Sequence, residues 1–338
     1  MSSAPAYPFP DGTLPSNVPF STSGFNDNEQ VRSFLDVVAR YVHELGRYLD
    51  MEFLAGVTIA MNLQTALDAI DHGYDNPPPL TFSDNEHIRA VAKSVPVVRD
   101  GRPRKLIVYD AEFLVPLLDP DGEHYQVALQ VLAHECGHVA ETKWRETAFP
   151  FTSIRRGYPT TVDALLTATA HICWEEYAVC RLTACFGDQG DRNADLASSV
   201  QSLTSAALPA AQVHKEHYRI HQKIEQLLGD AGVSLCEPLR ICAYLLGHMD
   251  GLDDGRELVE VVPALAESPF IAVFAQAHQA LRDIWNTRED WADEDKVFAP
   301  LRAAAESAMN LAAIAFEPMP DGQTYVRVGP QCPSENGA

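Results

Sequence analysis

The sequence lacks a long apolar run, and this absence limits the classes of protein to which the chain can belong. No stretch approaches the roughly 18 consecutive apolar residues that a membrane-spanning helix needs. The first residues also lack a basic start followed by an apolar segment, the pattern of a secretory signal. We therefore expect a cytoplasmic protein that is not inserted in a membrane.

Positive charge is scarce as well. The chain has 25 Lys and Arg residues against 47 Asp and Glu residues, which gives a formal net charge of -22. Such a balance repels the phosphates of nucleic acids and the headgroups of anionic lipids. We expect neither nucleic acid nor a membrane surface as a partner.

The cysteines do not form a recognisable pairing pattern. There are seven in 338 residues, an odd number, and no two of them are spaced as CxxC. Scattered single cysteines are typical of reduced, mostly buried side chains in a cytosolic protein.

The remaining composition is that of a globular chain, with 46% hydrophobic and 21% charged residues. Residues 1–26 are rich in Pro, Ser, Gly and Asn, and we expect them to be disordered. Residues 27–188 mix helical and strand patterns, whereas 189–318 read as helical, with Pro209 kinking or breaking the first helix. Residues 319–338 read as a polar tail with one short strand at 324–328. The expected fold class is α+β, with a small sheet and an active-site helix followed by a mainly helical region.

Within residues 27–188 the apolar spacing predicts an ordered series of elements. Pro96 lacks an N–H group and places its strand at a sheet edge or bulge. The Asp100-Gly101 pair between two runs of β-branched residues predicts a hairpin turn. The expected elements are a helix over 28–50, a strand over 53–61, a helix over 62–71, a hairpin with strands 91–98 and 106–109, and helices over 123–142 and 161–186.

The segment His134-Glu135-Cys136-Gly137-His138 lies in the helix expected over 123–142. Histidines four residues apart project from one face of a helix, which lets both imidazoles bind one Zn²⁺. Glu135, next to the first ligand, is placed to act as the general base for a metal-bound water. With 12 histidines and 47 acidic residues in the chain, this pattern is expected by chance only about 0.06 times. The pattern therefore predicts a zinc site.

A catalytic zinc site needs a third protein ligand and an open position. The best source is the pair Glu175-Glu176, on the apolar helix expected over 161–186. Adjacent helical residues point about 100° apart, so only one of the two carboxylates faces the metal. We favour Glu176, whose helical face continues through small residues, and keep Glu175 as the alternative. The group that stabilises the oxyanion is not identified by any pattern; the candidates are Tyr158, His171, His217, Tyr218 and His221.

A HExxH helix followed on a later helix by a glutamate, with a small sheet before the first helix, resembles the gluzincin branch of the zincin metallopeptidases. Within that branch, the intracellular ImmA/IrrE-like group is the nearest comparison. The resemblance covers roughly residues 53–187. It implies that His134 and His138 are zinc ligands, that Glu135 is the base, and that Glu176 or Glu175 is the third ligand. The implied activity is hydrolysis of peptide bonds in a protein or peptide substrate.

Two other functions stay open at this point. The main alternative is a regulatory or interaction protein that keeps the metal as a structural or vestigial site. The intact Glu135 argues against it, because a purely structural site needs no base. The second alternative is a hydrolase of a non-peptide amide.

Overall fold

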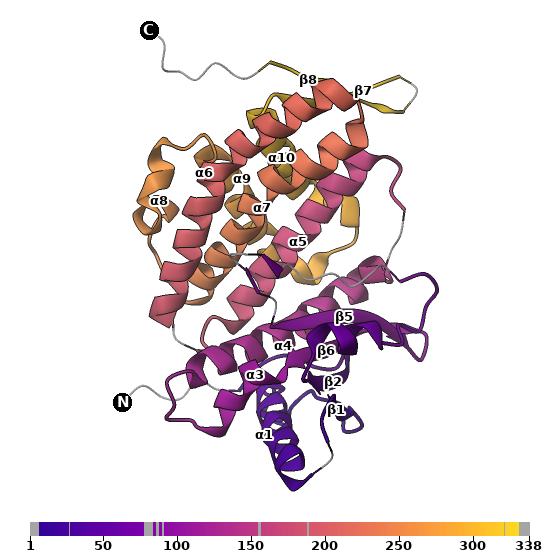
Figure 1. The fold of residues 1–338 in the computed structure, drawn as a ribbon, viewed down its shortest axis with the longest axis vertical. Helices are drawn as coiled ribbons and strands as arrows, with labels where there is room; N and C mark the ends of the chain where they lie inside the picture. The colour runs from indigo at the N-terminus through magenta and orange to yellow at the C-terminus, as the bar shows by residue number, and fades with distance from the viewer. Residues whose placement is uncertain are drawn as a thin grey trace. The chain divides into compact units, whose positions relative to one another are not determined.

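The computed structural model of the chain describes residues 7–26, 28–77, 84–85, 88–89, 91–154, 157–187, 189–320 and 322–330. These residues fold as α+β and form two compact units (Figure 1). The first unit comprises residues 1–155 and 182–189, and the second comprises residues 156–181 and 190–338. In the described residues, no helix is long and apolar enough to cross a membrane.

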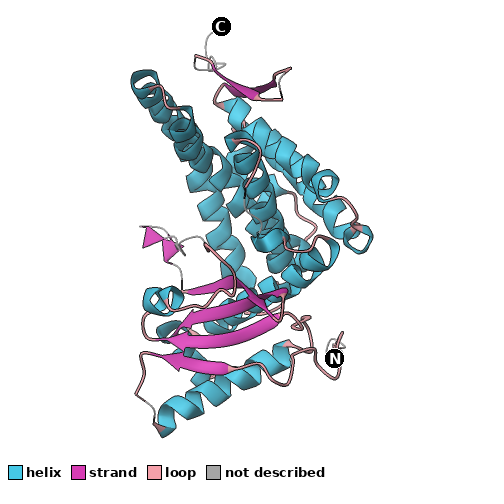
Figure 2. Ribbon diagram, turned by 90° about the vertical axis from the view of Figure 1, so that its right-hand side faces the viewer, coloured by secondary structure: helices cyan, strands magenta, loops and turns pink. Residues whose placement is uncertain are grey.

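The first unit is built on a sheet, drawn in magenta in Figure 2. The sheet has four strands in the order β1-β2-β6-β5. β1, β2 and β6 run parallel, whereas β5 runs antiparallel to β6 and lies at the end of the sheet. The Asp100-Gly101 turn joins β5 and β6, as predicted, with φ angles of 51° and 71° that suit a tight hairpin. The elements are β1 (Phe20–Ser23), α1 (Glu29–Leu45), β2 (Leu54–Ala60), α2 (Leu63–Asp68), β3 (Asp84–Asn85), β4 (Ile88–Arg89), β5 (Ala92–Arg99), β6 (Arg102–Asp110), α3 (Ala111–Leu114), η1 (Val115–Leu118), α4 (Tyr125–Ala148) and η2 (Thr152–Ile154).

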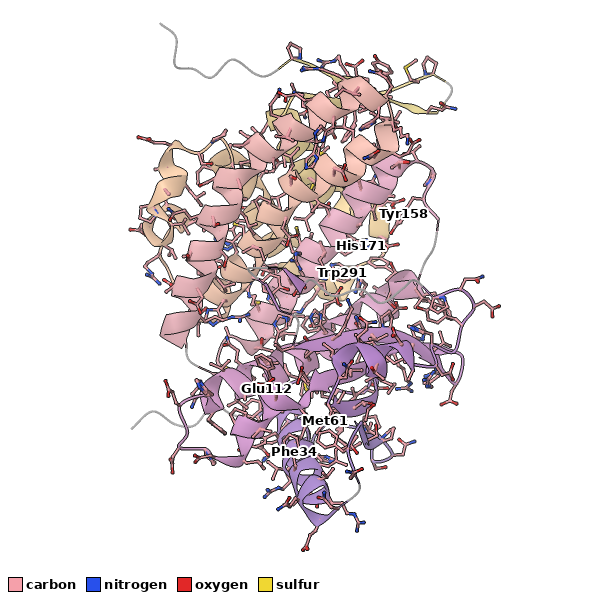
Figure 3. The ribbon with its side chains drawn as sticks, in the orientation of Figure 1. Phe34, Met61, Glu112, Tyr158, His171 and Trp291 are labelled. Carbon is pink, nitrogen blue, oxygen red and sulfur yellow. The ribbon has the colours of Figure 1, made fainter. Side chains whose placement is uncertain are left out.

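Helices cover the sheet on both sides. On one side, apolar residues of α1 and α4 pack with alternate residues of β2 and β6 in a single core. The members of that core include Phe34, labelled on α1 in Figure 3, together with Val38, Val57, Ile107, Leu132 and Val139. On the other side, α2 packs against the opposite faces of β5 and β6 through Leu63, Leu67, Val95 and Val108. The alternation of apolar residues along each strand therefore decides which helix each face receives.

The expectation of disorder over residues 1–26 does not hold for the part that the structure describes. Residues 20–23 form β1, which pairs with residues 57–60 of β2. Phe20 packs against the core under α1, and the Thr13 hydroxyl donates to the carbonyl oxygens of Gly46 and Leu49 at 3.0 and 2.8 Å. Composition missed this strand because backbone pairing and a few anchoring contacts hold it, without any periodic pattern.

The second unit is helical apart from one hairpin. Its elements are α5 (Thr161–Thr183, which ends in the first unit), α6 (Gln189–His221), α7 (Ile224–Gly251), α8 (Leu258–Val261), η3 (Pro263–Glu267), α9 (Ile271–Asn286), η4 (Arg288–Asp290), α10 (Glu294–Leu311), β7 (Ile314–Pro318) and β8 (Thr324–Val328). Most of α5 thus belongs to the second unit, whereas the sequence pattern had grouped it with the motif helix.

Of the two outcomes expected at Pro209, a kink or a break, the break does not occur. α6 runs as one 33-residue helix with Pro209 inside it. The break comes instead at Gln222, whose φ of 57° is left-handed and ends the helical path before α7. Thr324–Val328 forms a strand as predicted, and it pairs with the unexpected strand β7.

Two contacts fix α5 within the second unit. Gly247 of α7 lies so close to α5 that a Cβ there would stand 2.3 Å from the carbonyl oxygen of Tyr177. The Tyr177 hydroxyl also donates to the carboxylate of Asp250, one turn further along α7, at 2.6 Å. His171 and Trp174 of α5 form an aromatic cluster with Trp291 and Phe298; His171 and Trp291 are labelled in Figure 3.

Candidate metal centre

The two histidines of the motif lie side by side on α4. Their ring centroids are 5.0 Å apart and their planes meet at 86°. One ligand atom from each of His134, Glu135 and His138 lies within 4.8 Å of the other two. In the described part of the chain, this is the only such group of three or more His, Cys, Asp or Glu residues. The spacing read from the sequence therefore converges in space as predicted.

Side chains from the sheet and from the loop that precedes β2 hold the motif helix in place. The Tyr109 hydroxyl of β6 donates to the carbonyl oxygen of Leu132 at 3.0 Å, just before the motif. Eleven residues further along α4, Lys143 donates to Asp50 and Glu52 at 2.7 and 2.5 Å. These two anchors lie on either side of the motif, so they limit sliding of α4 along the sheet.

A third anchor reaches the motif itself. The Ser94 hydroxyl of β5 lies 2.8 Å from Oε2 of Glu135 and 3.2 Å from the carbonyl oxygen of the same residue. A hydroxyl that donates to a carboxylate makes a strong, charge-assisted hydrogen bond. Ser94 was missed by the sequence analysis, because a single serine in a strand carries no local signal of what lies opposite. The contact joins the edge strand directly to the expected base.

Cys136, in the middle of the motif, faces away from the histidines. Its sulfur lies 3.9 Å from the Tyr109 hydroxyl inside the core. Burial raises the pKa of the Cys136 thiol to about 12. A thiol binds metal as the thiolate, so this residue stays neutral and serves as a small core side chain. The six cysteines that the structure describes form no disulfide with one another.

The residues present suit a zinc ion. Two imidazoles and a carboxylate are the donor types that Zn²⁺ takes in catalytic sites. His138 is buried, with 8% of its surface exposed, whereas His134 is partly exposed. A partly open pair of imidazoles is compatible with a metal that also receives water and substrate. The group could hold a metal ion, and its identity as zinc stays a prediction.

Glu176 and Glu175 lie on α5, in the second unit. Glu176 is buried, with 5% of its surface exposed, whereas Glu175 is partly exposed. Burial, together with the charge of the neighbouring Glu176 carboxylate, raises the pKa of Tyr244 on α7 well above its ordinary value. Glu176 is therefore a buried carboxylate close to the Tyr244 hydroxyl of the same unit. Its role as third ligand, like that of Glu175, remains a prediction from the sequence.

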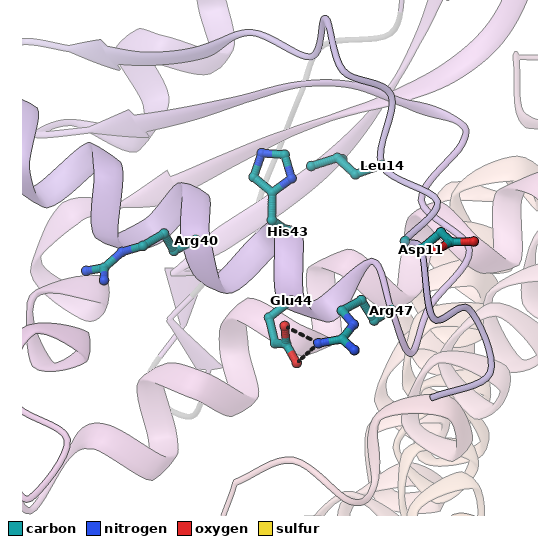
Figure 4. Close-up of a pocket in the computed structure, with 7 residues that line it drawn as sticks. Asp11, Leu14, Arg40, His43, Glu44 and Arg47 are labelled. Carbon is teal, nitrogen blue, oxygen red and sulfur yellow. Dashed lines mark hydrogen bonds and ion pairs between the residues drawn. The ribbon is translucent and has the colours of Figure 1, made fainter. Parts of the chain in front are cut away.

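A separate depression of about 520 Å³ lies on the exposed side of α1 (Figure 4). Its lining is mainly polar and charged and includes no residue of the motif: Asp11, Gly12, Leu14, Arg40, His43, Glu44 and Arg47. Glu44 and Arg47 neutralise each other through hydrogen bonds of 3.1 and 3.2 Å, and the Arg47 guanidinium lies 3.4 Å from the centre of the Tyr7 ring. This depression is where the N-terminal segment is attached to α1.

Comparison with known proteins does not add to these observations. No family model, no curated protein and no solved structure matches this chain.

Proposed function

We propose that the protein is a zinc-dependent peptidase whose metal is held by His134 and His138. The observation that carries this proposal is the convergence of both imidazoles and the Glu135 carboxylate within 4.8 Å, on a helix that the edge strand contacts directly. Glu176, or Glu175 in its place, is proposed as the third ligand. Zn²⁺ bound there would polarise the substrate carbonyl and make a bound water more acidic.

Glu135 is proposed as the general base. Its Oε2 accepts the Ser94 hydrogen bond, which fixes the carboxylate and leaves Oε1 to receive a proton from water. In the net reaction, the hydroxide of that water adds to the carbonyl carbon, the C–N bond breaks, and the proton passes to the leaving amine. Glu135, next to the ligand His134, thus transfers the proton and does not need to bind the metal.

The substrate is proposed to be an extended peptide that adds to the outer edge of β5. Strand addition supplies backbone hydrogen bonds without demanding a particular sequence. In the described residues β6 is the only strand that pairs with β5. The other edge of β5 therefore offers backbone N–H and C=O groups to a peptide next to Glu135. The acidic chain favours a protein or peptide substrate over nucleic acid, and its free cysteines fit a cytoplasmic location.

Metal analysis with matched variants tests the metal site. Protein purified without added metal should contain close to one equivalent of zinc, and His138→Ala should lose most of it. His124→Ala removes an exposed histidine at the start of the same helix and serves as the control that should keep its zinc. Undiminished zinc in His138→Ala would exclude the site.

A second pair of variants separates catalysis from a structural zinc site. Glu135→Gln should keep zinc and fold but lose hydrolysis of a mixed-sequence peptide library, because the amide cannot take a proton. Glu123→Gln, an exposed acid just before the helix, should behave like the wild type. If zinc-loaded wild-type protein cleaves no peptide, the alternative of a regulatory or structural zinc protein is favoured.

A further inference from the structure

The outer edge of β5 is open over only part of its length. The Asp110 N–H donates to the Val91 carbonyl oxygen at 2.8 Å, which sets the alternation of the β5–β6 ladder. The odd-numbered residues of β5 consequently bond to β6. The N–H and C=O groups of Ala92 and Ser94 point outward, as does the C=O of Pro96. Among the described residues, these outward backbone groups have no backbone partner.

The same edge is closed at Val98 by the segment 71–73. The Val98 N–H donates to the His72 carbonyl oxygen at 2.8 Å, and Arg99 donates to the Asp71 carbonyl oxygen at 2.7 Å. Gly73, with φ of 70°, packs so tightly that a Cβ would stand 2.2 Å from the Val98 oxygen. Only glycine fits there, because the obstacle is backbone and cannot rotate away. The segment therefore acts as a fixed end to the strand edge.

The open stretch begins beside the expected base. Ser94 bonds Glu135 with its hydroxyl and directs its own N–H and C=O toward the outer edge. A peptide with its reacting bond beside Glu135 would pair with Ser94 and advance along β5 at about 3.3 Å per residue. It meets segment 71–73 after about three residues, since Val98 lies four positions beyond Ser94. Antiparallel pairing is the more stable arrangement, and it places the N-terminal end of the peptide at Val98.

We infer that the peptidase trims extended peptides near their N-terminus, with segment 71–73 as the stop that limits how many residues precede the cut. This inference rests on the proposed function and adds the substrate class: peptides with a free, extended N-terminal end. A longer N-terminal extension collides with His72 and Gly73 instead of continuing along the edge.

The test uses full-length, zinc-loaded protein and a mixed-sequence library of 12-residue peptides with free N-termini, read by mass spectrometry. Cuts should fall after the first three or so residues. Adding five Gly and Ser residues to the N-terminus should reduce cleavage at the original bond about tenfold. Internal cleavage that ignores the extension would overturn the inference.

A variant pair tests the stop itself. Gly73→Ala should push segment 71–73 off β5 and raise internal cleavage of the extended peptides about tenfold. Gly12→Ala introduces the same left-handed strain, with φ of 76°, but its nearest neighbour is a side-chain atom at 3.9 Å, so its cleavage pattern should stay that of the wild type. An unchanged pattern in folded Gly73→Ala would refute the role of the stop.

A binding measurement keeps this inference distinct from the proposed function. If zinc-loaded wild-type protein cuts no peptide, the proposed activity fails, and binding of fluorescein-labelled peptides to Glu135→Gln still tests the edge. Peptides with a free N-terminal end should bind about tenfold more tightly than the same peptides joined by their N-terminus to a folded carrier protein, because the carrier cannot pass segment 71–73 in any register. Equal binding of the two sets would overturn the inference even if Gly73→Ala fails to fold.

Discussion

Two glycines on α7 allow the packing between α7 and α5 to be measured. An added Cβ at Gly247 would stand 2.3 Å from the Tyr177 oxygen and 2.9 Å from two further backbone atoms of Tyr177. An added Cβ at Gly229, on an exposed turn of the same helix, would meet no atom within 4 Å. The same substitution to alanine therefore separates helix propensity from close packing.

The two substitutions should change the free energy of unfolding in opposite directions. Alanine is favoured over glycine in a helix interior by about 1 kcal/mol, so Gly229→Ala should raise the free energy of unfolding by roughly 0.5–1 kcal/mol. Gly247→Ala gains the same propensity but pushes against the backbone of α5, and overpacking costs about 1–3 kcal/mol or more. Because that backbone cannot move without disturbing the Tyr177–Asp250 bond, we expect a net loss of about 2 kcal/mol.

Urea unfolding followed by tryptophan fluorescence measures both effects. Three of the four tryptophans, Trp174, Trp285 and Trp291, lie in the second unit, and Trp144→Phe removes the signal of the first. A Gly247→Ala protein as stable as the wild type in that background would show that α7 and α5 are not packed this closely. If Glu176 is the third ligand, Gly247→Ala should also weaken zinc retention, because Glu176 precedes Tyr177 in the chain.

Three other predictions concern single groups. Burial, with the charge of Arg192, lowers the pKa of His248 to about 4, whereas in the unfolded chain it protonates near 6.5. The contribution of neutral His248 to the free energy of unfolding is complete above about pH 6.5 and decreases as the pH falls toward 4. His248→Gln should therefore reduce the slope of the unfolding free energy against pH in this range. Of the two α5 glutamates, Glu176→Ala should lose zinc at least tenfold more readily than Glu175→Ala, and equilibrium dialysis that gives the reverse order makes Glu175 the ligand. Thiol titration of denatured, unreduced protein should count nearly all seven cysteines, and a count of one would indicate three disulfides.

The sequence alone predicted the convergence of the motif histidines, because that convergence depends only on local helix geometry. Residues four apart on a helix share a face wherever that helix lies, so His134 and His138 converge in the fold as expected. The hairpin before them was equally local, since Asp100-Gly101 favours a tight turn and Pro96 favours a sheet edge or a bulge. The order of helical and strand patterns along the chain likewise predicted an α+β fold with a small sheet.

Tertiary structure alone decided what surrounds that chemistry. β1 joins the sheet by backbone pairing, which a Pro- and Ser-rich composition does not predict. Ser94 meets Glu135 across 41 positions of sequence. Segment 71–73 closes the β5 edge through hydrogen bonds to Val98 and Arg99, which lie more than 20 positions away in the chain. Pro209 stays inside an unbroken α6, although its local effect is to disrupt a helix. Periodicity tells which face of an element is buried, whereas backbone contacts between distant segments decide which groups a substrate would meet.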